Sequence, residues 1–162
     1  AERSTQLLFC VYRAPLIDPF TYVRMVAHVL GHGSYGHFMS NMMLLLVVGP
    51  PLEEKYGSRR LLVCIVLTAL VSGLVQFFLF PGTALLGASG IVFMMIVHPS
   101  LAGMREGAIP LTLILVVILY LGGEVIDAVM AQDNVSQLTH IVGGLCGAVL
   151  GFAMERRGSS FS

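Results

Sequence analysis

Long apolar runs separated by short polar connections dominate this sequence. The clearest run, 61–80, contains no charged residue over about 20 positions, and as a helix it is long enough to cross a hydrocarbon layer of roughly 30 Å. Three shorter apolar runs are also predicted to be spanning helices, and the first of them is closed by Gly49-Pro50-Pro51 and by Glu53-Glu54-Lys55. Those three runs are 37–52, 109–126 and 138–154.

A fifth apolar segment, 89–104, is too short to cross the bilayer comfortably. At a rise of about 1.5 Å per residue it is about 24 Å long as a helix. This length suggests that the preceding residues 81–87 dip into the protein, so that the helix begins below the membrane surface. Non-helical backbone is tolerated at that depth where protein or a water-filled cavity surrounds it. We therefore expect Ser89 at a helix N-terminus, next to water.

The positive charges predict the orientation of the chain. They fall on alternate connections and at the C-terminus, which marks that side of the membrane as cytoplasmic. Residues 1–36 are interrupted by arginine and proline, and we interpret them as an interfacial segment on the outer side. The chain is thus predicted as a single domain with a transmembrane core at 37–154 and a cytoplasmic tail at 155–162. The positive charges are Lys55, Arg59, Arg60, Arg105, Arg156 and Arg157.

Composition agrees with a membrane protein. Hydrophobic residues make up 56% and charged residues 11% of the chain, and the mean hydropathy is +0.87, far from a soluble domain. A formal net charge of zero gives no argument for a nucleic-acid partner. Cys10, Cys64 and Cys146 are odd in number, so we expect buried thiols rather than a disulfide framework. The chain begins with Ala and shows no signal peptide, which we interpret as a fragment or a processed chain.

Two polar residues within the apolar segments suggest catalysis. Ser89 lies between small residues, which leave its hydroxyl accessible and allow a close backbone approach. His140 precedes a small-x-x-x-small pattern that lets another helix approach closely. If that helix begins at Ser89, imidazole and hydroxyl come within reach as base and nucleophile, and the absence of a nearby acidic residue favours a dyad over a triad. The small residues are Gly87, Gly90, Gly143 and Gly147.

His37 and Asn41 share one face of a predicted helix because they are four positions apart. A buried carboxamide of this kind either bonds two helices together or donates hydrogen bonds into a cavity. Together with Ser89 and His140, the spacing favours donors for an oxyanion.

His28, His32 and His37 are spaced H-x-x-x-H-x-x-x-x-H. The zinc-protease motif requires a glutamate after the first histidine, and Val29 stands there instead. A structural or adventitious metal site is one interpretation, and the alternative that we favour is a hydrogen-bonded polar cluster at the membrane surface.

These motifs, in this order and spacing, resemble the rhomboid intramembrane serine proteases from about residue 24 to residue 154. The resemblance implies an all-α, polytopic bundle with a six-helix core, of which five transmembrane helices are visible and the first is absent. It also implies a re-entrant loop before the serine helix. The matching residues are Arg24, His28, His32, His37, Asn41, Gly49, Glu53, Gly57, Ser58, Gly87, Ser89, Gly90, His140, Gly143 and Gly147.

The resemblance also implies roles for individual residues. Ser89 is the nucleophile and His140 the general base, while His37, Asn41 and the Ser89 backbone N–H form the oxyanion hole. Phe93 corresponds to an aromatic position that packs against the catalytic imidazole. Arg24 and Glu53 correspond to structural positions, one in the outer loop and one at the cytoplasmic end of the next helix.

The sequence thus predicts a serine endopeptidase that cleaves transmembrane segments of other membrane proteins near the outer face. It needs no cofactor and contacts lipid, and a bacterial inner membrane is its expected location. The helix ending at Glu124 is a candidate lateral gate. The alternatives are a non-catalytic rhomboid-like protein that binds membrane clients, and a small channel or transporter lined by His and Asn. His98 has no counterpart in the family, and we interpret it as a hydrogen-bonded or snorkelling residue.

Overall fold

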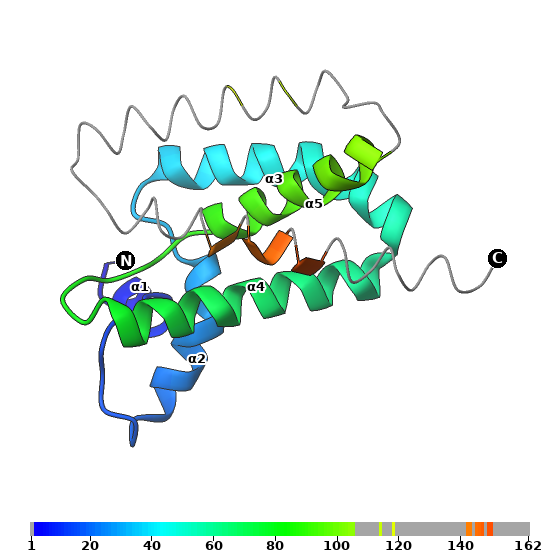
Figure 1. The fold of residues 1–162 in the computed structure, drawn as a ribbon. Helices are drawn as coiled ribbons and strands as arrows, with labels where there is room; N and C mark the ends of the chain where they lie inside the picture. Colours follow the sequence, from blue (N-terminus) through cyan, green and yellow to red (C-terminus); the bar gives the residue numbers. More distant parts are fainter. Residues whose placement is uncertain are drawn as a thin grey trace.

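All the regular elements in the part of the chain that the structure describes are helices. In this computed structural model the described residues are 2–105, 114, 118, 142–143, 145–147 and 149–150. The predicted all-α fold is therefore confirmed (Figure 1). The elements are α1 (Glu2–Leu8), α2 (Pro19–Ala27), the 3-10 helix η1 (His28–Leu30), α3 (Tyr35–Tyr56), α4 (Ser58–Leu79) and α5 (Ser89–Arg105).

The three long helices form a bundle (Figure 1). α3 and α5 run in the same direction, and α4, which connects them in the chain, runs in the opposite direction. At one end of the bundle, the ring of His37 in α3 lies against the backbone just before α5. At the other end, the rings of Tyr56 and His98 meet edge to face with their centroids 4.5 Å apart. The core between the helices is apolar, and its buried members are Val48, Leu52, Cys64, Ile91, Val92, Met94, Met95 and Ile96.

Among the described residues, α4 is the helix that is both long enough and apolar enough to cross a membrane by itself. This agrees with the prediction of a spanning helix at 61–80. α5, with 17 residues, is shorter than α4, with 22, as predicted for the segment 89–104. The predicted spans at 109–126 and 138–154 lie mostly outside the described residues, and the described residues within them are helical.

Of the two signals predicted to close the run 37–52, Pro50 and Pro51 do not end the helix, because α3 continues through both to Tyr56, directly after Glu53-Glu54-Lys55. Proline removes backbone donors inside a helix, but membrane helices tolerate it where neighbouring groups take over the freed carbonyls. The helix ends instead at Gly57, whose φ of 82° is a conformation that favours glycine. The N–H of Gly57 donates to the carbonyl of Glu53, and the Ser58 hydroxyl donates to the Glu53 carboxylate at 2.6 Å.

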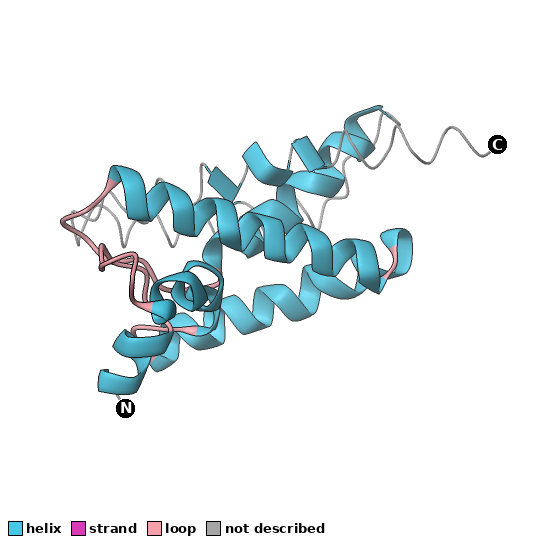
Figure 2. Cartoon of the chain, turned by 90° about the horizontal axis from the view of Figure 1, so that it is seen from below, coloured by secondary structure: helices cyan, strands magenta, loops and turns pink. Residues whose placement is uncertain are grey.

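The loops of the described chain gather mainly at one end of the bundle, next to the N-terminus (Figure 2). Here α2 crosses α4 in direct backbone contact, since a Cβ at Gly73 would lie 2.2 Å from the carbonyl oxygen of Met25. The exposed side of α2 carries Phe20, Tyr22 and Val23, each about half exposed. An apolar outer face on a short helix beside a spanning helix is typical of an interfacial segment, which stays a prediction for residues 1–36.

Arg24 is buried inside this N-terminal region, with 3% of its side chain exposed, and it contacts several of its segments. Its guanidinium donates to the carbonyl of Leu7 at 2.9 Å, to the Thr21 hydroxyl at 3.2 Å, and to the carboxylate of Asp18. It also lies 4.6 Å from the ring centroid of Tyr12. The ion pair with Arg24 lowers the pKa of Asp18. These contacts join α1 and α2, while the structural role that the resemblance implies for Arg24 stays a prediction.

Replacing Arg24 by lysine is expected to lower the free energy of unfolding by about 1–2 kcal/mol, because one ammonium cannot reproduce the fork of donors. Thermal unfolding in detergent measures the change. Arg60→Lys, at an exposed position on α4, is the matched control and is expected to shift stability by less than about 0.5 kcal/mol. Equal unfolding temperatures for Arg24→Lys and wild type would contradict the role assigned to the guanidinium.

Candidate active site

Ser89 is the first residue of α5 and is almost fully buried, with 6% of its surface exposed. The segment 80–88 that leads to it, called here the pre-serine loop, carries no helix. Leu85 in this loop exchanges two backbone hydrogen bonds with Val11, at 2.8 and 2.9 Å. The N–H of Gly87 donates to the carbonyl of His28 at 2.9 Å. The segment containing Val11 and the turn after α2 thereby fix the second half of the pre-serine loop.

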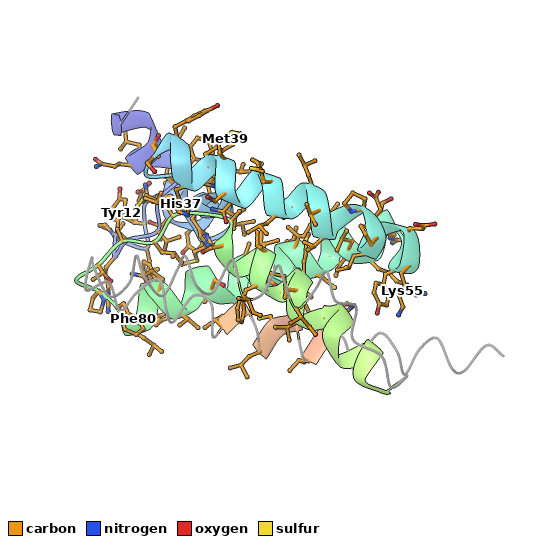
Figure 3. All side chains as sticks on the ribbon, turned by 90° about the horizontal axis from the view of Figure 1, so that it is seen from above. Tyr12, His37, Met39, Lys55 and Phe80 are labelled. Carbon is orange, nitrogen blue, oxygen red and sulfur yellow. The ribbon has the colours of Figure 1, made fainter. Side chains whose placement is uncertain are left out.

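The ring of His37 lies directly over the backbone just before Ser89. A Cβ at Gly87 would come within 2.8 Å of the His37 Cε1 atom, and the φ of Gly87 is 124°. Only glycine satisfies both the space and the backbone conformation without strain. His37 itself lies at the start of α3 (Figure 3). Its N–H donates to the Ser34 hydroxyl at 3.1 Å. The imidazole predicted as an oxyanion donor therefore adjoins the backbone that leads to the serine.

Asn41 lies one turn after His37 on α3, with 1% of its surface exposed. Its side-chain NH₂ donates to the carbonyl of His37 at 3.1 Å, which uses one of its two hydrogens. Its Oδ1 is buried and has no hydrogen-bond partner within the described residues. The carboxamide thus keeps a second N–H for another acceptor, on the helix face that begins with His37.

Gly143 and Gly147 pack against the serine helix. A Cβ at Gly143 would lie 2.2 Å from the carbonyl oxygen of Gly90, and one at Gly147 would lie 2.6 Å from that of Met94. The two glycines therefore allow direct backbone contact with the first turns of α5, beside Ser89. His140 lies outside the described residues, and so does the predicted contact between its imidazole and Phe93.

The other histidines divide between this region and the far end of α5. His28 is buried, which lowers the pKa of its ring to about 4 and keeps it neutral, and its carbonyl holds Gly87. Burial and the neighbouring His37 lower the pKa of His32, whose ring meets that of His37 edge to face at 5.1 Å. Within the described ranges, no three His, Cys, Asp or Glu side chains are grouped as metal ligands. His98 is buried beside Tyr56, about 14 Å along α5 from Ser89.

Several contacts at this site carry no signal in the sequence. The Val11–Leu85 pairing joins two segments that are far apart in the chain, and neither residue stands in a recognisable strand pattern. His28 supports the pre-serine loop through its carbonyl, a group that every residue possesses. The three cysteines are free thiols, and Cys10 and Cys64 are buried as predicted, whereas Cys146 is half-buried. The candidate gate at Glu124 lies outside the described residues.

Gly87→Ala is expected to lower the rate of any reaction at Ser89 about tenfold or more. An alanine would have to adopt a positive φ and displace the His37 ring, and such strain costs on the order of 1–3 kcal/mol. Gly82→Ala is the matched control in the same loop, because a Cβ there meets open space and its φ is not positive. Rates of covalent labelling by a serine-directed reagent compare the two variants, and equal rates would show that the Gly87 backbone does not position the serine.

The sequence comparisons identify the family to which this arrangement belongs. A Rhomboid domain profile matches residues 19–157, most of the chain. The chain belongs to the rhomboid family. The rhomboid family is membrane-embedded, and its helical bundle agrees with the helices described above. The predicted resemblance is therefore confirmed at the level of the family.

Three curated relatives illustrate the similarity. "Rhomboid protease GlpG" of Pectobacterium atrosepticum is 30% identical over 80% of this chain and 47% of its own length. "Rhomboid-like protease 3" of Toxoplasma gondii is 33% identical over 54% of this chain and 33% of its own length. "Rhomboid-related protein 1" of Caenorhabditis elegans is 26% identical over 81% of this chain and 39% of its own length. This chain thus spans a third to about half of the length of these rhomboid relatives.

Proposed function

We propose that this chain is an intramembrane serine endopeptidase that cleaves transmembrane segments of other membrane proteins near the outer face. In this proposal His140 takes the proton from the Ser89 hydroxyl, and the Ser89 oxygen attacks the scissile carbonyl carbon. The C–N bond then breaks as the leaving amine takes the proton from His140. A water molecule activated by His140 releases the acyl group and restores both residues.

The observation that carries the proposal is the contact of Gly143 with Gly90. Gly90 follows Ser89 directly, and His140 precedes Gly143 by three residues, which is about one helical turn. Because side chains three or four apart share a helix face, a helix seated at Gly143 on Gly90 brings position 140 toward the start of α5. The small-residue pattern supports the Ser–His dyad by supplying the close approach that a dyad needs.

The surroundings of Ser89 support an oxyanion hole made by three donors. The His37 ring adjoins the backbone before the serine, and Asn41 has an N–H to spare on the same face of α3. The N–H of Ser89 belongs to the first turn of α5, where backbone donors have no partner within the helix. Donors held in place before the reaction stabilise the oxyanion most where water is scarce, as at a nearly buried serine.

The proposed substrate is a transmembrane helix that unwinds locally, because an intact helix shields its carbonyl groups. Small or helix-weak residues near its outer end are therefore preferred at the cleavage site. The Glu124 helix as the entry gate and a bacterial inner membrane as the location are parts of the same proposal. The relatives include proteins of bacteria and of eukaryotes, so the location rests on the sequence prediction alone.

The direct test is covalent labelling of the detergent-solubilised wild-type chain by a fluorescent fluorophosphonate, with the adduct located by peptide mass spectrometry. We expect a single adduct, on Ser89. The same experiment on a longer form of the protein, matching the length of its relatives, controls for segments that precede or follow this chain. A rhomboid-like protein that only binds membrane clients would remain unlabelled in both forms, and that result would reject the proposal.

A further inference from the structure

Gln76 is a polar side chain in the last turn of α4 that is almost completely buried, with 2% exposed. Its amide donates to the Thr83 hydroxyl at 2.9 Å and to the carbonyl oxygen of Phe80 at 3.3 Å. Both the hydroxyl and the N–H of Thr83 donate to the same carbonyl at 3.3 Å. One buried amide thus ties the first half of the pre-serine loop to the end of a spanning helix.

The pre-serine loop is held by different neighbours at its two ends. Val11 and His28 hold Leu85 and Gly87 through backbone hydrogen bonds. The first half is largely exposed, and a Cβ at Gly82 would meet no atom within 4 Å. Among the described side chains, Gln76 is the one that donates a hydrogen bond into this half from outside the loop. Among the described residues, the other hydrogen bonds in this half are those of its own turn, from Thr83 to the carbonyl of Phe80.

The residue type at position 76 indicates that these bonds matter. An amide buried without hydrogen bonds costs free energy, whereas an apolar side chain at the same depth is favourable. The next buried side chain of α4, Phe77, is apolar, and by the same reasoning leucine would be easier to bury at position 76 than glutamine. The amide compensates for its burial through the two acceptors in the loop.

We propose that Gln76 and Thr83 act as a positioning pair that sets the conformation of the pre-serine loop and so the direction of the Ser89 N–H. The inference rests on the proposed function, in which this N–H stabilises the oxyanion. Neither side chain touches the reacting atoms. Their effect passes along the backbone from Thr83 to Gly87 and then to the start of α5.

Three substitutions test the pair. Gln76→Met keeps the length of the side chain and removes its donor, and Thr83→Val keeps the shape and removes the hydroxyl. We expect each to lower kcat for a transmembrane substrate about five- to tenfold with KM unchanged, the effect of losing one hydrogen bond of about 1 kcal/mol. The double variant is expected to fall no further, because both changes break the same link. Thr83→Ser keeps the hydroxyl and is the matched control, with kcat near that of wild type.

Hydrogen–deuterium exchange supplies a readout that does not require catalysis. In Gln76→Met, the amides of 83–87 are expected to exchange faster than in wild type. Additive losses in the double variant, or unchanged exchange and kcat in both single variants, would overturn the pairing. If Gln76→Met does not fold, the Thr83→Val variant, which changes an exposed residue, tests the pair by the same measurements of kcat and amide exchange. If the wild type is not labelled at Ser89, the proposed function fails, and the exchange rates still decide whether the pair holds the loop.

Discussion

Ser89→Ala is expected to abolish covalent labelling and to lower cleavage of a transmembrane substrate by at least about 10³-fold, because the nucleophile is lost. His140→Ala is expected to have nearly the same effect, and the double variant to be no worse than either single variant. Residues that act as one unit show this non-additivity. The prediction follows from the proposed dyad, which is supported by the contact of Gly143 with Gly90, because His140 precedes Gly143 by three residues in the sequence.

Labelling intensity after a fixed incubation and cleavage rates in detergent measure both variants. Ser40→Ala is the matched control, because Ser40 is an exposed serine of α3 that the proposed mechanism does not use. It is expected to be labelled and to cleave as wild type does. Labelling that persists in Ser89→Ala would move the nucleophile to another residue. A small effect of His140→Ala beside complete loss in Ser89→Ala would remove the dyad but keep the serine.

Asn41→Ala is expected to lower kcat about 10²- to 10³-fold, the usual effect of removing one oxyanion donor. KM is expected to change little, since the oxyanion exists only after the serine has attacked. The structure gives the physical reason, because Asn41 is buried one turn from His37 and uses only one of its two amide hydrogens within α3.

Steady-state kinetics with a transmembrane substrate separates kcat from KM in this variant. The bond to the His37 carbonyl, which this variant loses, lies within α3. Thermal unfolding is therefore measured in parallel, and the free energy of unfolding is expected to fall by only about 1 kcal/mol. A normal kcat with a lowered unfolding temperature would identify Asn41 as a bond between helices. That was the alternative interpretation of its spacing with His37.

The helical segments of this fold were largely predictable because the bilayer restricts what an apolar segment can do. Within the bilayer, a single charge-free run such as 61–80 is stable as a helix, and α4 covers this run. The short run at 89–104 predicted from its length that a helix begins at Ser89, and α5 begins there. Pro50 and Pro51 were wrongly predicted to end α3, since proline in a membrane helix is less disruptive than in water.

The contacts that arrange the site could not be predicted in the same way. Gly31 and Gly73 each allow another backbone to approach, at Phe9 and Met25 respectively. A glycine in the sequence does not indicate which residue will pack against it. The link from Gln76 to Thr83 joins residues seven apart across a turn, with no periodic pattern that marks it. The small-residue spacing at Gly143 was the exception, because it specified a helix face and left only the partner open.

The shared direction of α3 and α5 has an electrostatic consequence. Both helices begin at the same end of the bundle, where the His37 ring of α3 meets the backbone that leads into α5. Each helix N-terminus carries the equivalent of about half a positive charge from its aligned peptide groups, and low dielectric surroundings preserve that field. An anion formed at Ser89 therefore meets two such fields at once. Because peptide groups do not titrate, this part of the stabilisation is the same at every pH at which the helices are folded.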